Sequence, residues 1–240
     1  MTGRQSPGPL LVLVAVRFEA QGLARRLSRT GPGFAASNLL IRTVGLGSAD
    51  LGRVGPGLAA LRPRGVLVTG LAGGCAPGVG SGEILVGSVV GPTARGAWVV
   101  PDASFMARVL GAVRASRLPH RVGPLVTVGE VAATPEAKAA LWRAHQAVGV
   151  DMESAHVLDW AAAAGLPAAV VRAVADGPRD ALPPALVRAV SPDGRTRWTV
   201  VAGWVARPEV FMTAWRFRRQ GHLALDRLAR VVLTLAACPS

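Results

Sequence analysis

Seven short apolar segments recur along the chain, and they constrain its fold more than any other feature. They are rich in valine, leucine and isoleucine, and segments of helical period separate them. Short apolar runs that are continuous rather than alternating are typical of strands buried on both faces of a sheet. The chain is therefore predicted to be an α/β protein with both sheet faces covered. The runs are LLVLVAV (10–16), LLIRTV (39–44), GVLVTG (65–70), EILVGSVV (83–90), PLVTV (124–128), VGV (148–150) and AAVVRAV (168–174).

Helical segments follow most of these runs, and one helix start is well marked. Thr134 offers a hydroxyl cap, Pro135 suits the first helical position and Glu136 adds an acid to the first turn. No Gly/Ser linker and no internal repeat divides the chain, so we expect one domain over residues 1–240. Its catalytic core is expected at about 8–180, followed by a helical, basic C-terminal extension at about 181–240. Helices are expected to begin near Glu19, Ala49, Ser104, Thr134 and Glu153, with a helical cluster from about Leu182.

The net charge of +13 is high enough for a nucleic-acid-binding protein, but its composition argues against that class. Every basic residue except Lys138 is arginine, in a chain rich in alanine, glycine and proline, which a GC-rich coding bias produces without any binding role. No zinc-finger, RRM or basic-zipper pattern is present. Arginines beside tryptophans in the last quarter are more typical of contact with an anionic or membrane surface. These are Arg195, Arg197, Arg216, Arg218, Arg219, Arg227 and Arg230.

The sequence shows no pattern of a membrane span, a disulfide framework or a metal site. The N-terminal PLLVLVAV is about half as long as a spanning helix, and no small-residue cleavage site follows it. Cys75 and Cys238 lie far apart, and the four histidines show no HExxH or His-x-His spacing. We therefore expect a cytoplasmic protein without a metal or organic cofactor. The basic C-terminal helices add the alternative of peripheral association at the inner membrane face.

Polar groups and glycines gather at the junctions where predicted strands end, which is where such sheets bind ligands. The first junction, VRFEAQGL, contains Arg17 and Glu19. Glu19 is either a carboxylate favoured by the helix dipole or a site residue. The junctions TVGLGSADLG and VTGLAGGCAPGVGSGE let the backbone approach a ligand through glycines such as Gly45, Gly70 and Gly73. Neither matches a Walker A or a GxGxxG pattern.

The stretch GVDMES places two carboxylates, Asp151 and Glu153, around Met152 where a short strand meets a helix. Glu153 alone is more typical of a helix cap than of a ligand contact. A carboxylate at this place can also accept hydrogen bonds from both hydroxyls of a ribose while the methionine packs on the sugar. Negative charge below the ring stabilises positive charge at the anomeric carbon. Asp151 is expected to brace the loop or to contact the substrate.

Asp176 ends the apolar run of VVRAVADGPRD. An acid at such a place is either a turn-former or a general acid. A carboxyl group that reaches a purine ring nitrogen protonates it and makes the base a good leaving group. Asp180, on the polar loop beyond, is expected to be solvated.

In this order, the segments VRFEAQGL, VGLGSA, VTGLAGGCAPGVGSGEILVGSVV, VDMES and VVRAVADG resemble the nucleoside phosphorylase and nucleosidase superfamily, to about residue 180. The continuation ADGPRDALPPALVRAVSPDGRTRW, with its basic tail, resembles the hopanoid-associated phosphorylases within it. The resemblance implies a three-layer α/β/α nucleoside phosphorylase-like fold with a central mixed β-sheet, and usually a homo-oligomer. It also implies cleavage of the N-glycosidic bond of adenosylhopane, which releases adenine and a ribosyl or phosphoribosyl hopane.

The same resemblance implies roles for individual residues. Glu153 and Met152 match the acid and the methionine that hold the ribose, and Asp176 matches the acid at purine N7. Glu19 matches the acid that orients the attacking water in hydrolytic members. The backbone cradle near the nucleophile is matched by Gly70, Leu71, Ala72 and Gly73.

The chain also departs from the family pattern. Val68 and Leu71 stand where phosphorolytic members carry an arginine and a serine or threonine, so two phosphate ligands are missing. Water and inorganic phosphate therefore both remain candidate nucleophiles. Ala175 stands where hydrolases often carry serine, so Asp176 is predicted to lose a supporting hydrogen bond. The alternatives are a nucleosidase for methylthioadenosine or S-adenosylhomocysteine and a non-catalytic nucleoside-binding relative. If phosphate is the nucleophile, the residues expected to bind it in place of the two missing ligands are Arg17, Arg42, Gly45 and Thr69.

Overall fold

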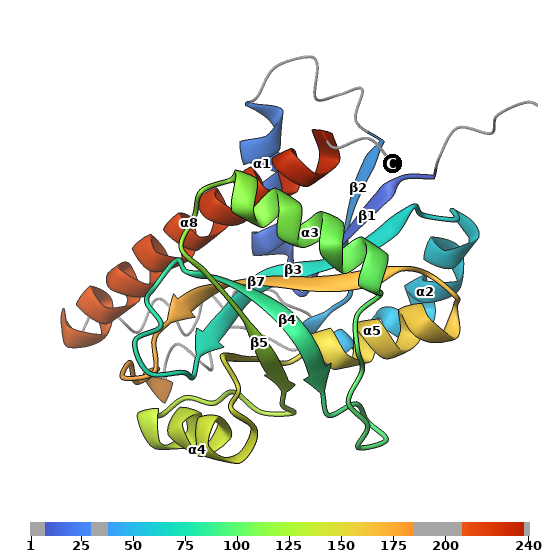
Figure 1. The fold of residues 1–240 in the computed structure, drawn as a ribbon. Coiled ribbons are helices and arrows are strands. Elements are labelled where there is room, and N and C mark those ends of the chain that lie inside the picture. The colour runs from blue at the N-terminus through green and yellow to red at the C-terminus, as the bar shows by residue number, and fades with distance from the viewer. Residues whose placement is uncertain (1–7, 30–37, 185–207, 238–240) are drawn as a thin grey trace, which may run out of the picture.

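The computed structural model describes residues 8–29, 38–184 and 208–237, which form a seven-stranded sheet with helices packed on it (Figure 1). The strands lie where the apolar runs predict them. The first and the last strand are buried along almost their whole length, as expected for continuous apolar runs. The strands are β1 (Leu10–Val14), β2 (Leu39–Thr43), β3 (Gly65–Gly74), β4 (Ile84–Gly91), β5 (His120–Thr127), β6 (Gly149–Asp151) and β7 (Ala168–Asp176).

The sheet is mixed, as predicted, and it closes on itself. Its strand order is β2-β1-β3-β6-β5-β4-β7, and β3 also pairs with β7. The β3–β6 and β4–β7 pairs are antiparallel, whereas the other pairs are parallel. Because β1, β3 and β7 run parallel, their carboxyl ends meet at one edge of the sheet. This edge brings the end of β7 beside the glycine-rich end of β3.

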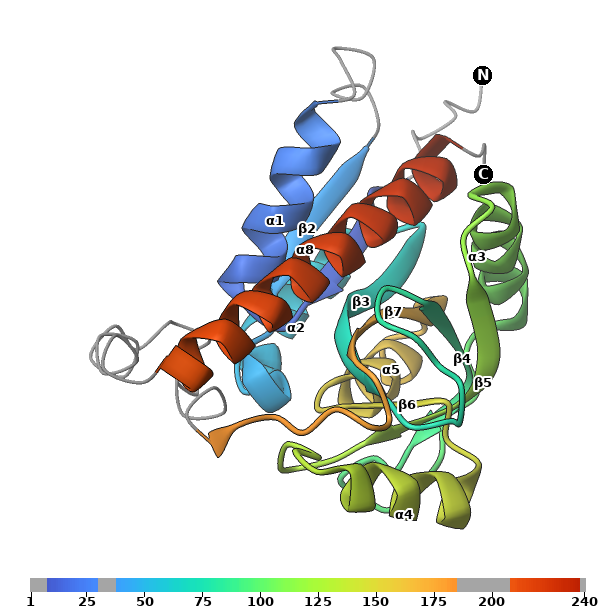
Figure 2. The ribbon, with the colours of Figure 1, turned by 90° about the vertical axis from the view of Figure 1, so that its left-hand side faces the viewer.

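Helices cover both faces of the sheet, so the predicted three-layer α/β/α architecture is confirmed (Figures 1 and 2). One core cluster joins the sheet to α1 (Arg17–Ser28), α3 (Ala103–Ala115) and α8 (Pro208–Ala237). A second cluster joins the opposite face to α2 (Leu51–Ala60) and α5 (Ser154–Ala163). The short 3₁₀ helix η2 (Leu46–Ser48) precedes α2, and α4 (Pro135–His145) follows β5.

The C-terminal helix α8 is part of the main core, and Figure 2 shows it crossing the sheet. One face of the helix is buried in the cluster that it shares with α1 and α3. Its other face exposes Trp215 and Leu223. Across the described residues, no helix has the length and apolar character that crossing a membrane requires. Arg195, Arg197 and Cys238 lie outside the described residues. The buried residues of α8 are Ala224, Leu225, Leu228, Ala229, Val231, Val232 and Leu235.

The helix start predicted at Thr134 is confirmed. The Thr134 side chain accepts a hydrogen bond from the backbone N–H of Ala137 at 3.2 Å, and Pro135 is the first residue of α4. This cap leaves Lys138 in the first turn, where its side chain is fully buried. The start of α4 therefore carries a cation into the interior, next to the end of β7.

Candidate active site

A cavity of about 300 Å³ opens where the carboxyl ends of β1, β3 and β7 meet the end of β6. Most of the residues that the sequence singles out for a site line it together. Leu46, Val128, Val131 and Leu182 add apolar surface. The strand ends therefore converge on one cavity, as the topology requires. The predicted residues among its lining are Glu19, Leu71, Ala72, Gly73, Asp151, Met152, Glu153 and Asp176.

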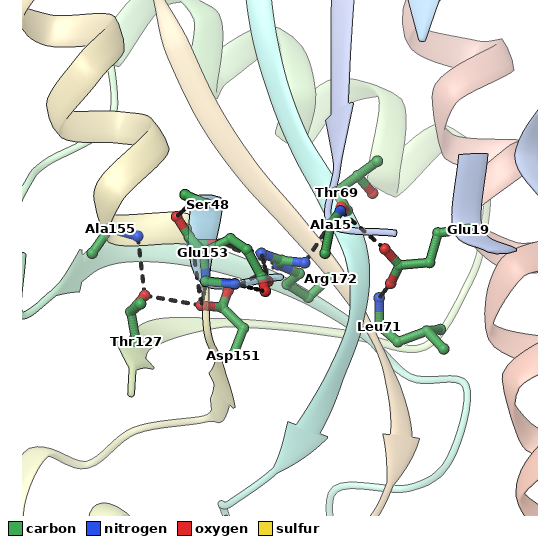
Figure 3. A network of polar contacts seen from close by, with 12 residues as sticks. Ala15, Glu19, Ser48, Thr69, Leu71, Thr127, Asp151, Glu153, Ala155 and Arg172 are labelled. Carbon is green, nitrogen blue, oxygen red and sulfur yellow. Dashed lines mark hydrogen bonds and ion pairs between the residues drawn. The ribbon is translucent and has the colours of Figure 1, made fainter. Parts of the chain in front are cut away.

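The centre of the polar network is Arg172, a side chain 1% exposed in the middle of β7 (Figure 3). Its Nε lies 2.9 Å from Asp151 Oδ2, and its Nη2 lies 3.3 Å from Glu153 Oε2. The guanidinium also donates to Ser154 Oγ and to the Thr69 carbonyl, at 2.9 and 3.3 Å. The sequence prediction missed Arg172. Its signal was a lone charge inside the apolar strand AAVVRAVAD.

Asp151 is held on both carboxylate oxygens. Its Oδ1 accepts the Thr127 hydroxyl at 2.9 Å and the backbone N–H groups of Glu153 and Ser154 at 3.2 and 3.1 Å. Its Oδ2 pairs with Arg172. Of the two predictions for Asp151, these contacts favour the bracing of the loop and of the start of α5. Its Oδ1 thus accepts three hydrogen bonds and its Oδ2 is paired with a buried guanidinium, although the residue borders the cavity.

Glu153 stands at the N-cap position of α5 but makes no side-chain cap, so the helix-cap interpretation is wrong. Its Oε1 instead accepts the backbone N–H of Gly47 at 3.0 Å. The pKa of Glu153 is raised to about 7, because burial and the carboxylates of Asp151 and Glu19 raise it more than Arg172 and the Gly47 N–H lower it. The side chain thus presents a carboxylate to the cavity in a neighbourhood that already holds other acids.

Glu19 lies in the first turn of α1 and also lines the cavity. Its Oε2 accepts the backbone N–H groups of Ala15 and Val16 at 3.1 and 3.3 Å, which ties it to the start of α1. Its Oε1 accepts the N–H of Leu71 on β3 at 2.7 Å (Figure 3). Burial raises the pKa of Glu19, whereas Arg172 and these backbone N–H groups lower it. The carboxylate is therefore fixed between two strand ends and faces the cavity.

Gly70 explains how Glu19 and Arg172 come close. Its φ is +139°, and a Cβ at this position would lie 2.7 Å from Glu19 Oε1 and 2.8 Å from Arg172 Nη1. Only a residue without a side chain leaves room for both charged groups. Gly70 does not line the cavity itself. The space beside Gly70 is therefore filled by two side chains of the protein, and the approach of its backbone to a ligand stays a prediction.

The four predicted substitute phosphate ligands do not line the cavity. Arg17 and Arg42 are exposed, and Arg42 Nη1 donates to the neighbouring Ile41 carbonyl at 2.8 Å because β2 is an edge strand. Gly45 forms the turn before η2 with a φ of +79°. Thr69 is fully buried, and its hydroxyl has no hydrogen-bond partner within the described residues.

Asp176 is buried and pairs with a lysine that sequence reasoning also missed. Lys138 Nζ lies 2.5 Å from Asp176 Oδ2. Burial raises the pKa of Asp176, Lys138 lowers it, and Asp180 raises it. The predicted loss of a supporting hydrogen bond through Ala175 is compensated by this ion pair from α4. In the part of the chain that the structure describes, no cluster of three or more His, Cys, Asp and Glu side chains suits a metal ion.

Comparison with protein-family models matches residues 27–199 to the phosphorylase superfamily. Comparison with curated protein sequences finds no match.

Solved structures with the same fold cover nearly the whole chain. The 5′-methylthioadenosine/S-adenosylhomocysteine nucleosidase of Helicobacter pylori superposes with a TM-score of 0.69 at 14% identity, over 96% of this chain and 98% of that one. The futalosine hydrolase of the same organism gives 0.68 at 14%, over 95% and 97%. The S-adenosylhomocysteine nucleosidase of Streptococcus pyogenes gives 0.69 at 16%, over 99% and 100%. These likenesses establish the fold.

Proposed function

The chain belongs to the phosphorylase superfamily, and from that premise we propose that it is a nucleosidase that cleaves the N-glycosidic bond of a purine nucleoside. The family resemblance drawn from the strand-end motifs is confirmed by this membership. The observation that carries the proposal is the joint placement of Glu19, Glu153 and Asp176 around one cavity. In this proposal each of the three buried acids has one role: Glu19 acts on the nucleophile, Glu153 on the sugar and Asp176 on the base.

At the sugar, Glu153 accepts hydrogen bonds from the ribose hydroxyls, and Met152 packs beside the ring. The carboxylate is close to Asp151 and Glu19, while Arg172 is their shared cation. This excess of negative charge supports an oxocarbenium-like transition state, because positive charge develops at C1′ as the bond breaks. Glu153 is therefore assigned to transition-state stabilisation as well as to binding.

At the base, Asp176 is the general acid. The electron pair of the C1′–N9 bond moves into the purine, and N7 takes a proton from the Asp176 carboxyl group. Burial raises the pKa of Asp176, which favours the protonated form that this step needs. The base then leaves as neutral purine.

At the opposite face of the sugar, water is the nucleophile and Glu19 is its base. Water attacks C1′ and loses a proton to Glu19. The products are therefore the free sugar, with a hydroxyl group at C1′, and the purine. No free cationic side chain lines the cavity in the described part of the chain, and Arg172 is already engaged by Asp151, Glu153 and Ser154. A phosphate dianion between two carboxylates would be repelled, which favours hydrolysis over phosphorolysis.

Product analysis tests this proposal. The protein is incubated with adenosine, methylthioadenosine, S-adenosylhomocysteine and adenosylhopane, in phosphate-free buffer and in buffer with phosphate. We expect adenine and the free sugar at the same rate in both, as detected by mass spectrometry. A sugar 1-phosphate that forms only with phosphate would overturn the hydrolytic mechanism. The absence of adenine with every nucleoside, adenosylhopane included, would favour a non-catalytic binding protein.

We further propose that the nucleoside carries a large apolar 5′ group, as adenosylhopane does. The apolar lining of Leu46, Val131 and Leu182 supports this choice. Turnover of adenosylhopane should exceed that of methylthioadenosine when both are presented in detergent. The reverse preference would point to a methylthioadenosine-type nucleosidase instead.

A lipid-tailed substrate also suggests contact with the membrane surface. Trp215 and Leu223 are exposed on α8, and the Arg219 guanidinium lies 4.9 Å from the Trp215 ring centre. Removing α8 would destroy the core, so liposome flotation should instead compare Trp215→Ser and Leu223→Ser with Val122→Ser, an exposed position on β5. We expect weaker flotation for the first two variants only. Equal flotation of all three would rule out this surface.

A further inference from the structure

Lys138 is the one lysine among 27 lysine and arginine residues, and its side chain is fully buried. Resting on the proposed function, we propose that Lys138 is the positioning residue of the general acid. Its ammonium group holds Asp176 Oδ2, leaves Oδ1 to the purine, and stabilises the carboxylate that forms when the proton leaves. Lys138 touches neither substrate nor reacting atoms in this role.

The contacts of Lys138 fit an ammonium group. Its Nζ donates to the carbonyls of Gly177 and Asp180 at 2.9 and 2.8 Å, in addition to its ion pair with Asp176. An ammonium group has three N–H donors and no acceptor, and here it faces three oxygen atoms, two through hydrogen bonds and one through the ion pair. A neutral amine would turn its lone pair toward one of these oxygens. The geometry therefore assigns the positive charge to Lys138.

The same contacts orient the acid. Asp176 Oδ2 is committed to Lys138, whereas Oδ1 accepts no hydrogen bond from the described residues. The two carbonyls belong to the loop that follows β7, so Lys138 also fixes the chain just beyond the acid. A compact ammonium group suits this point contact better than the planar fork of an arginine. One buried cation thereby sets both the position of the carboxyl group and the direction of its free oxygen.

The proton balance gives Lys138 a constant charge. Asp176 gives its proton from Oδ1 to purine N7 and becomes a carboxylate, while Lys138 keeps all three of its protons. The new negative charge then lies beside the ammonium group, where opposite charges in a buried site attract strongly. After the products leave, Asp176 regains a proton from solvent, and the proton that Glu19 took from water returns to solvent.

Other groups near Asp176 have smaller effects on its protonation. Asp180 raises its pKa, and Arg216 of α8 lies 3.6 Å from Asp180, where the pair is partly exposed. Cys75, just after β3, is buried, and burial raises the pKa of its thiol to about 12, so that it stays neutral. Lys138 is thus the one cation in direct contact with Asp176 among the described residues.

The pH profile of Lys138→Met separates positioning from mere structural support. We expect kcat/KM for a purine nucleoside to fall by about 10- to 100-fold, a part of what general acid catalysis contributes. Removing the ammonium group raises the pKa of Asp176, so the alkaline limb of the profile should move to higher pH. Arg143→Met, an exposed position on the same helix, should leave the limb in place. A lowered rate with an unmoved limb would overturn the proposal.

A second measurement does not depend on a foldable Lys138 variant. Because the chain has a single lysine, protein labelled with ¹⁵Nζ-lysine gives one side-chain resonance. We expect an ammonium signal at neutral pH that shifts as Asp176 titrates and loses that shift in Asp176→Asn. A neutral amine signal, or the same shift in the variant, would contradict the pairing.

The two proposals fail in different ways. If the wild-type protein releases no purine from any nucleoside, the proposed function is wrong, and the lysine resonance still decides the pairing. If the wild type is active and Lys138→Met keeps the alkaline limb, only the role of Lys138 is wrong.

Discussion

The two buried ion clusters of the cavity differ in their charge balance. At the sugar end, Arg172 pairs with both Asp151 and Glu153, and Glu19 lies close enough to raise the pKa of Glu153. At the base end, Lys138 pairs with Asp176 alone. Acids therefore outnumber cations where positive charge develops in the proposed reaction, and they are matched one to one where a proton is handed over. Both ends of the cavity are built from buried acids and cations, and the ratio of acids to cations sets the different role of each end.

The largest expected effect comes from removing the shared cation. Arg172→Met leaves two buried carboxylates without their partner, and breaking a buried pair costs about 3–5 kcal/mol. Urea unfolding should show a loss of this size. Arg121→Met removes a partly exposed ion pair with Glu83 and should cost only about 0–1 kcal/mol. Similar losses in both variants would mean that the Arg172 cluster is no more important to folding than a surface pair.

The contact across Gly70 should give the next largest effect. Gly70→Ala places a methyl group against Glu19 and Arg172, and crowding of this kind costs about 1–3 kcal/mol. The control is Gly111→Ala in α3, where a Cβ meets nothing within 4 Å. That variant should gain about 0.5–1 kcal/mol because alanine favours a helix. Equal stability of Gly70→Ala and the wild type in urea would show that the close approach of the two charged groups does not depend on the missing side chain at this position.

Glu153→Gln should separate stability from function. The folded-state pKa of Glu153 is raised from 4.5 to about 7, so its contribution to stability is lost as pH rises through this window. Glutamine does not ionise and so avoids this loss. The difference in melting temperature, variant minus wild type, should therefore be larger at pH 8 than at pH 5. Purine release should fall at the same time. Glu136→Gln, exposed on α4, is the control and should show no such pH dependence.

The smallest expected effect is on substrate binding. Only the ionised form of Glu153 accepts hydrogen bonds from both ribose hydroxyls, and that form decreases as pH falls below about 7. KM should therefore rise on the acid side of neutrality. Initial rates between pH 5 and 8 measure it, and a KM that stays constant down to pH 5 would remove Glu153 from the ribose.

Strands and the main acids were predictable because their signals are local. Continuous apolar runs mark buried strands, and the acids at their carboxyl ends must share one edge of the sheet once the strands are parallel. Glu19, Glu153 and Asp176 therefore reach one cavity as the sequence predicts. Their assignment to nucleophile, sugar and base remains a proposal.

Partners of these acids were not predictable from the sequence. Lys138 reaches Asp176 from α4, and Arg172 contacts Glu153, which lies 19 positions away, and Thr69, which lies 103 positions away. Such pairs follow from tertiary packing and have no local spacing. Arg17 and Arg42 lie near strand ends in the sequence, but sequence position does not give the direction of a long side chain. Both side chains are exposed.

Adenine release by Asp176→Asn tests the central claim most directly. The assay compares wild type, Asp176→Asn and the control Asp226→Asn, an exposed acid of α8 that pairs with Arg26 and does not line the cavity. We expect Asp176→Asn to fold and to lose about 10²- to 10⁴-fold in kcat/KM, the range of general acid catalysis. The control should keep the wild-type rate. Turnover by Asp176→Asn close to that of the wild type would contradict the assignment of the general acid and with it the proposed mechanism.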